Sequence, residues 1–370
     1  MATSLSAINR FYDTYGFTLY PNAYSHYATT KNAIPNMLNM SAHPIPVSVK
    51  TRFKEKKQII EKTAFKNRVF DHLSSENYPI RVYQSRYMGF CKNDEHTIAS
   101  CLTVNSALSS IEETPLMLHG KTGLLLDHFA ASSTMKTLGL FINSMQFFSR
   151  TFDALSWLGQ FKHLSVITHE FNKSSTLEGH AILERLFQDM LRDAPGAAYY
   201  AHVLSPHHPF VYDRECRLKP DPRDWIIHFD LDHSHVTGSD RDERYRAYDE
   251  QIACVYKTLE EGFQKLEKAG RLENMRFILH GDHGSRITEM AITAGAVLDE
   301  RWPKNQMDAF STLLAMRIPG QTGGIDTSAR SVQDAPRAFY LNGGRFEDDP
   351  APPWAYIGQY KVPLDHLPTQ

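Results

Sequence analysis

The stretch Phe277-Ile278-Leu279-His280-Gly281-Asp282-His283-Gly284-Ser285-Arg286 decides how the rest of this sequence is interpreted. A short apolar run of strand-forming residues stops at Gly281, and an acid and an imidazole follow before a second glycine. In α/β sheets, ligands bind in the crevice outside the carboxyl ends of the strands. The stretch therefore predicts a buried strand that delivers Asp282 and His283 to such a crevice, where both suit zinc, manganese or iron. The alternative is a plain turn capped by the aspartate.

The composition is that of an ordinary globular protein with a large core. The chain has 370 residues, 42% of them hydrophobic and 22% charged. A formal net charge of -2 provides no overall positive field, so the composition argues against nucleic-acid binding. The amino end has no basic segment followed by an apolar core, and charged residues interrupt the most apolar long window, residues 122–148. We therefore expect neither a secretory signal nor a membrane span in this chain, and its compartment stays open.

The four cysteines are Cys91, Cys101, Cys216 and Cys254. Because no two of them form a Cys-x-x-Cys pair, a zinc ribbon is excluded. Cys91 and Cys101 are close enough in the sequence to form a small disulfide loop in an oxidising compartment, and are two free thiols otherwise. The spacing does not decide between these states.

Hydrophobic periodicity predicts alternating helices and strands. Helices are expected over residues 7–16, 50–73, 177–192 and 240–272, and strands over residues 17–20, 80–85, 196–204, 277–280 and 310–317. Mixed signals over residues 101–157 predict helices and loops, and residues 346–370, rich in proline and aspartate, predict an irregular tail. Helices that alternate with strands indicate an α/β sheet.

Thr30 is the first candidate outside the opening stretch. Polar and small residues before it lead into a segment with Ile34, Met37 and Leu38 at helical spacing. Thr30 is therefore expected at or near a helix N-terminus, where unsatisfied N–H groups and the macrodipole favour an anionic ester. The alternative is that Thr29 or Thr30 serves only as an N-cap.

A histidine pair, His207 and His208, lies in a Ser-Pro-His-His-Pro-Phe loop that follows the predicted strand over residues 196–204. Prolines on both sides restrict the backbone, which suits the rigid presentation of a side chain. The alternative is a pair of solvated loop histidines. A second cluster, residues 230–235, contains two aspartates and two histidines, and we interpret it as a solvated loop.

The ordered set of motifs resembles the alkaline phosphatase and sulfatase superfamily, and within it the sulfatase-like branch of phosphoethanolamine and phosphoglycerol transferases. Members carry a stretch similar to residues 20–25, followed by Thr-x-x-small-Ile/Val-Pro-x-Met, which residues 30–37 match. They also carry Pro-His-x-Pro-Phe/Tyr, matched by residues 206–210, and Gly-Asp-His-Gly, matched by residues 281–284. The resemblance extends over residues 17–317.

The resemblance implies an alkaline-phosphatase-like α/β fold, with a mostly parallel central sheet and helices on both faces. We expect one sulfatase-like domain over residues 1–345, followed by the irregular tail over residues 346–370. The family's first strand ends in an acidic metal ligand ahead of the nucleophile. No such strand precedes Tyr20 here, because Asp13 lies in a helical, aromatic context.

The resemblance also implies roles for individual residues. Thr30 would be both the nucleophile and a metal ligand, and Asp282 and His283 would be metal ligands. The contacts to the substrate phosphate or sulfate would come from His207, His208 and Arg286. A divalent metal, zinc or manganese, would lower the pKa of the hydroxyl and stabilise charge in an in-line displacement. The implied substrate is a small-molecule or lipid-linked phosphate ester, hydrolysed or transferred through a phosphothreonine.

Two alternatives accompany this phosphoryl hydrolase or transferase. The missing first-strand acid predicts either a degenerate, non-catalytic binding module or a fragment of a longer, membrane-anchored enzyme. The second alternative is a sulfatase, which Thr30 disfavours because sulfatases of this fold convert a cysteine or serine to formylglycine. The catalytic domains of the family usually face the periplasm or the exterior, so the resemblance suggests, without fixing it, a location outside the cytoplasm.

Overall fold

The computed structural model describes residues 5–43, 64, 66–85, 87–91, 98–104, 176–220, 225, 238–287, 302–347 and 352–365. Predictions for most of the helix expected over residues 50–73, for the apolar window 122–148 and for the cluster 230–235 lie outside these ranges. No helix within the described ranges is both long enough and apolar enough to cross a membrane.

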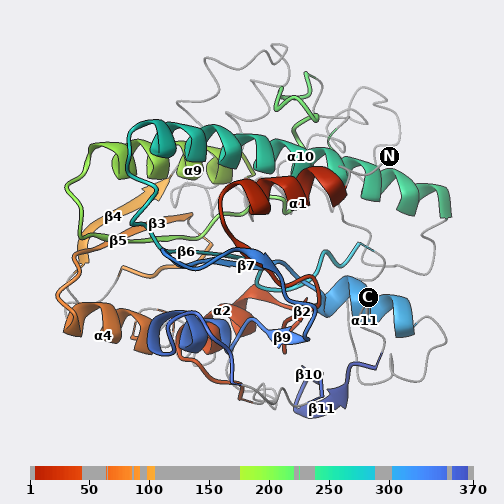
Figure 1. Ribbon diagram of the computed structural model, residues 1–370. Helices are drawn as coiled ribbons and strands as arrows, with labels where there is room; N and C mark the ends of the chain where they lie inside the picture. The colour runs from red at the N-terminus through yellow and green to blue at the C-terminus, as the bar shows by residue number, and fades with distance from the viewer. Residues whose placement is uncertain are drawn as a thin grey trace, which may run out of the picture.

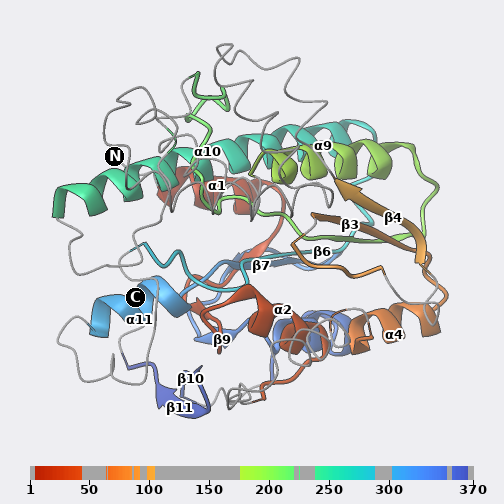
Figure 2. The same ribbon diagram turned by 180° about the vertical axis from the view of Figure 1, so that it is seen from behind.

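Helices cover both faces of the sheet layer (Figures 1 and 2). One helical layer contains α1 (Leu5–Thr14), α9 (Thr176–Arg192) and α10 (Gly238–Lys268), and the opposite side carries α2 (Thr30–Leu38) and α4 (Arg68–Ser75). The predicted α/β class with helices on both faces is therefore confirmed. The turn after α1 falls at Gly16, whose φ of 70° is the left-handed conformation that glycine adopts without strain.

The main layer contains two sheets. The first has the order β4-β3-β5 and is parallel throughout, with β3 (Ile80–Ser85), β4 (Ile98–Val104) and β5 (Ala198–Ala201). The second has the order β6-β7-β1-β8, with β1 (Thr18–Leu19), β6 (Phe277–His280), β7 (Leu314–Arg317) and β8 (Gly324–Ile325). β7 runs antiparallel to β1 and β6, whereas β1 and β8 are parallel. The prediction of helix or loop from residue 101 is wrong for residues 101–104, because they pair with β3.

Smaller elements complete the described fold. β2 (Ala23–Tyr24) pairs with β9 (Arg330–Ser331), α11 (Trp302–Phe310) precedes β7, and Arg337–Leu341 is a π-helical turn. β10 (Trp354–Ile357) and β11 (Tyr360–Pro363) form a hairpin within the tail that was predicted to be irregular. The hairpin forms because Tyr356 N–H donates to the His26 carbonyl at 2.8 Å and the Tyr356 ring stacks on Tyr27. These partners lie over three hundred residues earlier in the chain, where local patterns do not reveal them.

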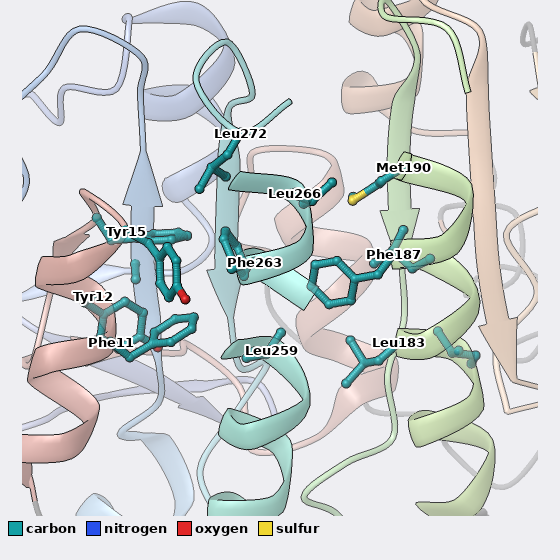
Figure 3. Packing of buried hydrophobic residues seen from close by; sticks show 14 of the residues in the cluster. Phe11, Tyr12, Tyr15, Leu183, Phe187, Met190, Leu259, Phe263, Leu266 and Leu272 are labelled. Carbon is teal, nitrogen blue, oxygen red and sulfur yellow. The ribbon is translucent and has the colours of Figure 1, made fainter. Parts of the chain in front are cut away.

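One aromatic core joins α1, α9 and α10 to the sheets (Figure 3). The fully buried Phe263 of α10 has ring centroids 5.6 Å from Phe11, 5.1 Å from Tyr15 and 5.8 Å from Phe187. Burying a side chain of this size stabilises a fold by about 2 kcal/mol or more, to which edge-to-face ring pairs add. The packing fixes α10 over the sheets, and α10 leads into the strand that carries the opening motif.

All four cysteines form disulfides, Cys91–Cys101 and Cys216–Cys254. The first is one of the two states that the sequence left open. The second was not predicted, since its cysteines are 38 residues apart. It ties the segment after the histidine loop to α10.

His26 makes the stability of this fold dependent on pH. Its ring stacks on Trp354 with centroids 3.8 Å apart, and its Nδ1 lies 2.7 Å from the Trp354 carbonyl oxygen. Burial lowers the pKa of His26 from 6.5 to about 4. As the pH falls through 6.5, the unfolded chain therefore takes up a proton on His26, whereas the folded chain does so only near pH 4. The free energy of unfolding therefore falls as the pH drops from 6.5 toward 4.

His26→Asn, which keeps a hydrogen-bond donor, removes this titration. When the pH falls from 7 to 4.5, the free energy of unfolding is expected to decrease by about 2 kcal/mol less in the variant than in the unchanged chain. Urea unfolding at both pH values measures the difference. An equal loss in the two proteins would show that His26 is not the group responsible.

Candidate active site

Thr30 is the first residue of α2 and is buried, with 7% of its surface exposed. Thr29 occupies the N-cap position with an extended backbone, but its hydroxyl makes no capping bond. That hydroxyl instead accepts a hydrogen bond from the Asn32 amide at 2.8 Å. The Thr30 side chain belongs to the helix itself and is directed toward a residue of the opening motif.

That residue is His283. Thr30 Oγ1 lies 3.2 Å from His283 Nε2, while His283 Nδ1 lies 2.7 Å from the carbonyl oxygen of Gly284. A carbonyl only accepts hydrogen bonds, so Nδ1 carries the hydrogen and Nε2 presents its lone pair to the Thr30 hydroxyl. Nε2 is thus oriented to accept a proton or to bind a metal.

Asp282 lies beside the same nitrogen. Its Oδ2 is 3.5 Å from His283 Nε2, is buried, and has no hydrogen-bond partner in the described part of the chain. Burial alone would raise the pKa of Asp282, but the His283 ring and the Thr30 hydroxyl hold it below its ordinary value. Burial lowers the pKa of His283, and Arg286 adds to that effect. Near pH 7 the carboxylate is therefore ionised and the imidazole neutral, the forms that ligate metals.

The backbone of residues 308–313 holds the motif in place. Gly281 N–H donates to Leu313 O and Gly284 N–H donates to Ala309 O, both at 2.9 Å. Thr312 Oγ1 donates to the carbonyl oxygen of His283 at 3.1 Å. The turn that carries Asp282 and His283 is thereby fixed against the segment between α11 and β7.

Gly284 is required by this close approach. A Cβ at this position would overlap the backbone of Asp308 and Ala309, which cannot rotate aside as a side chain can. Gly284→Ala is expected to lower the unfolding free energy by about 3 kcal/mol, measured by urea unfolding. The matched control is Gly89→Ala, where a Cβ meets nothing within 4 Å. A Gly284→Ala protein as stable as the control would contradict this account.

The structure brings the histidine loop to the same place. His207 and His208 are half-buried, with ring centroids 4.0 Å apart. Burial lowers the pKa of His207, and the charges of His208, His283 and Arg286 lower it further. The His207 carbonyl accepts hydrogen bonds from Thr176 Oγ1 and Gln251 Nε2, both at 2.8 Å. Side chains of α9 and α10, in addition to the prolines, therefore fix the loop.

Arg286 lies on the same turn and has a φ of 53°. The backbone N–H of Arg286 donates a hydrogen bond to the Asp308 carbonyl oxygen at 2.9 Å. Burial lowers the pKa of Arg286, while Asp282, Tyr87 and Asp308 oppose this effect. A guanidinium is charged at any physiological pH, so Arg286 gives the site a cation suited to an anionic group.

Sequence analysis missed three neighbours of Asp282: His202, His280 and Tyr87. His202 follows β5 and His280 ends β6, and Asp282 acts on the pKa of each. Burial lowers the pKa of His202 to about 4, and His202 Nδ1 has no hydrogen-bond partner among the residues described. The signal was available, since His202 is a polar residue at the carboxyl end of a predicted strand.

Tyr87 comes from the loop after β3 and had no such signal. Its ring centroid lies 5.5 Å from the Lys31 ammonium, and the Thr30 side chain acts on the pKa of its hydroxyl. Burial raises the pKa of Tyr87. The charge of Asp282 raises it further, whereas Arg286 and Thr30 lower it. Tyr87 is therefore a neutral hydroxyl beside the Thr30 side chain.

The side-chain donors of the site are of the types that bind a transition metal, but only a few of them lie in the described part of the chain. Asp282, His283 and Thr30 offer a carboxylate, an imidazole and a hydroxyl. Oδ2 of Asp282 is buried with no hydrogen-bond partner among the described residues, which suits a metal ligand. The described ranges contain no group of three or more histidine, cysteine, aspartate or glutamate residues that could hold a metal. Asp282, His283 and Thr30 supply three ligands, the lower of the three or four protein ligands that zinc sites use.

Comparisons with known proteins give a likeness in fold. No protein-family model matches the sequence, and no curated protein matches it. The C-terminal periplasmic domain of EcEptC from Escherichia coli, solved in complex with Zn, aligns with a TM-score of 0.51 and 10% identity over 95% of this chain and 83% of that chain. The phosphonate monoester hydrolase SpPMH from Silicibacter pomeroyi aligns with a TM-score of 0.49 and 11% identity over 91% of this chain and 68% of its own.

The chain therefore has the alkaline phosphatase and sulfatase fold, as the ordered motifs predicted. Among proteins of that fold, one that the chain resembles is the periplasmic domain of EcEptC. At 10% identity the likeness concerns the arrangement of helices and strands, and the chemistry must be argued from the site.

Proposed function

We propose that this chain is a metal-dependent phosphoryl-group hydrolase or transferase that acts on a phosphate ester through Thr30. The observation that carries the proposal is the 3.2 Å approach of Thr30 Oγ1 to Nε2 of a neutral His283, beside the ionised Asp282. A hydroxyl in this setting is suited to become a nucleophile. The EcEptC domain was solved with Zn, which supports zinc as the metal, and manganese is the alternative.

Asp282, His283 and Thr30 would hold the metal. When bound, the metal would lower the pKa of the Thr30 hydroxyl and stabilise the negative charge that develops during the reaction. Arg286 and His207 would contact the ester oxygens, and the positive end of the α2 dipole favours the same anion. Thr30 Oγ1 would release its proton to solvent and bond to phosphorus as the bond to the leaving oxygen breaks, and the leaving oxygen would take up a proton from solvent. Water or an acceptor hydroxyl would then displace Thr30 from the phosphothreonine and restore the free side chain.

Phosphate is preferred to sulfate because a threonine cannot be converted to formylglycine. The second candidate function is a non-catalytic binding module with the same fold. The shortfall of metal ligands within the described ranges is the observation in its favour. The two candidates differ in two measurable properties, stoichiometric metal binding and turnover.

The test combines metal analysis with turnover. The purified, untagged chain is expected to contain near-stoichiometric zinc or manganese by inductively coupled plasma mass spectrometry. It is also expected to hydrolyse bis(p-nitrophenyl) phosphate but not p-nitrophenyl sulfate. Bound metal without turnover of either ester would favour the binding module. Sulfate turnover would favour the sulfatase.

We also infer an oxidising compartment, with a small-molecule or lipid-linked phosphate ester as the substrate. Both disulfides support this location, because the cytosol keeps thiols reduced. The neighbour from Escherichia coli is itself a periplasmic domain. Mass spectrometry after alkylation of the natively expressed, denatured protein should find no modified cysteine, and four modified cysteines would overturn the inference.

A further inference from the structure

One buried glutamine of α10 binds the loop that carries His207 and His208. Gln251 has 0% of its surface exposed, although it lies in the interior of a helix of 31 residues. Its Nε2 donates a hydrogen bond to the His207 carbonyl oxygen at 2.8 Å, and its Oε1 accepts one from the Val211 N–H at 2.9 Å. The two ends of a single amide therefore bind the backbone before and after residues 208–210.

A second side chain reaches the loop from α9, which lies beside α10 (Figures 1 and 2). Thr176, the first residue of α9, is also buried, and its Oγ1 lies 2.8 Å from the His207 carbonyl oxygen and 2.9 Å from that of Pro209. Because a hydroxyl carries one hydrogen, Thr176 shares a single donor between two carbonyls. The Nε2 group of Gln251 carries two hydrogens, so Gln251 is the stronger of the two anchors for His207.

The segment that follows the loop is anchored to α10 by other contacts. The disulfide Cys216–Cys254 joins it to the helix, and Lys219 Nζ lies 2.9 Å from Glu250 Oε2. An apolar cluster around Cys254 packs the same segment against the helix. None of these contacts uses the amide of Gln251. Loss of that amide should therefore leave the segment on α10 and release only the loop.

The anchored backbone sets the position of the His207 ring. His207 Nδ1 lies 2.7 Å from the His208 carbonyl oxygen, which leaves Nε2 to contact a ligand. His283 and Arg286 both act on the pKa of His207, so the ring lies near the groups that would hold a phosphate. One proton joins Nε2 to a phosphate oxygen, whether the ring or a P–OH group supplies it. A shift of the loop backbone would move Nε2 away from that oxygen.

We propose that Gln251 is a positioning residue, whose amide holds the histidine loop so that His207 Nε2 meets the phosphate group of a ligand. The inference rests on the proposed function, in which His207 contacts the ester oxygens. It adds a residue of α10 that acts through His207 and sets the affinity of the site for phosphate. Gln251 is conformationally ordered by the helix, so the loop inherits the rigidity of α10.

The test begins with Gln251→Met, which keeps the length of the side chain and removes both hydrogen bonds. In the zinc-loaded chain at pH 6, the dissociation constant for inorganic phosphate, measured by calorimetry, should rise about tenfold. The KM for bis(p-nitrophenyl) phosphate should rise by a similar factor with kcat within about threefold, because the contact is made in both the ground state and the transition state. Gln264→Met, at an exposed glutamine of the same helix, is the matched control and should change neither constant.

A double-mutant cycle separates a positioning role from a purely structural one. If Gln251 acts through His207, then Gln251→Met should raise the phosphate dissociation constant of a His207→Ala chain by less than about twofold. A structural role would weaken phosphate binding by the same factor in both backgrounds, and that additive result would overturn the proposal. An unchanged dissociation constant in Gln251→Met alone would overturn it as well.

Gln251→Asn is the second variant, for use if thermal unfolding shows that Gln251→Met does not fold. Its amide is one methylene shorter and is withdrawn from the His207 carbonyl oxygen, so the same rise of about tenfold is expected. Failure of the proposed function is a separate result. Phosphate binding without ester turnover by the unchanged chain would refute the enzyme and leave the cycle to decide the role of Gln251. A zinc-loaded chain that binds no phosphate would overturn both proposals.

Discussion

Thr30→Ala is expected to lower the turnover of bis(p-nitrophenyl) phosphate by a factor on the order of 10⁴ or more, because the hydroxyl that attacks phosphorus is gone. The side chain is buried at the start of α2, and alanine is a good helix former, so the fold should survive. The metal should stay bound with lower affinity, because Asp282 and His283 remain. Steady-state kinetics at saturating zinc measures the loss.

The adjacent threonine is the matched control. Thr29 has the same side chain one position earlier, but its hydroxyl contacts Asn32 and lies outside the site. Thr29→Ala should keep turnover within about threefold, and Thr30→Ser, which keeps a hydroxyl, within about 100-fold. A fully active Thr30→Ala protein would mean that another group is the nucleophile. A covalent phosphate on Thr30, trapped at low pH and located by mass spectrometry, would support the assignment directly.

The predicted site residues that follow a strand share a local signal. Asp282, His283 and the histidine loop each follow an apolar run that ends at a glycine or proline, and a strand end is recognisable from a few neighbouring residues. The structure brings Thr30, His207, Asp282, His283 and Arg286 together because the carboxyl ends of β5 and β6 meet near the start of α2. Only the ordered resemblance, not any local pattern, linked Thr30 to residues more than 170 positions away.

What the sequence did not reveal depends on pairing between distant segments. The hairpin over residues 354–363 forms against residues 26 and 27, and the second disulfide joins Cys216 to Cys254 on α10. His202 could have been predicted from the sequence, because it is a polar residue at the carboxyl end of a predicted strand, as Asp282 is.

Asp282→Asn is expected to weaken zinc binding by more than about 100-fold. The substitution keeps the size of the side chain but replaces the only ionised donor of the described set with a neutral amide. Its Oδ2 is buried and has no hydrogen-bond partner among the residues described, and His283 and Thr30 keep the carboxylate ionised. The carboxylate is therefore the anchor for a cation. The two donors that remain, an imidazole and a hydroxyl, are neutral and too few for a stable zinc site.

The metal content after gel filtration, together with zinc titration by calorimetry, measures this effect. Zinc should raise the thermal midpoint of the unchanged chain and leave that of Asp282→Asn unmoved, because a ligand stabilises only the state that binds it. Asp334→Asn is the control, since Asp334 is an exposed carboxyl that lies beside Arg337 and Glu347 instead of His283. If the Asp282→Asn protein bound zinc with the same affinity as the control, the metal would have to be held by other residues. The assignment of Asp282 and His283 as ligands would then fail, even if Thr30 proved essential for turnover.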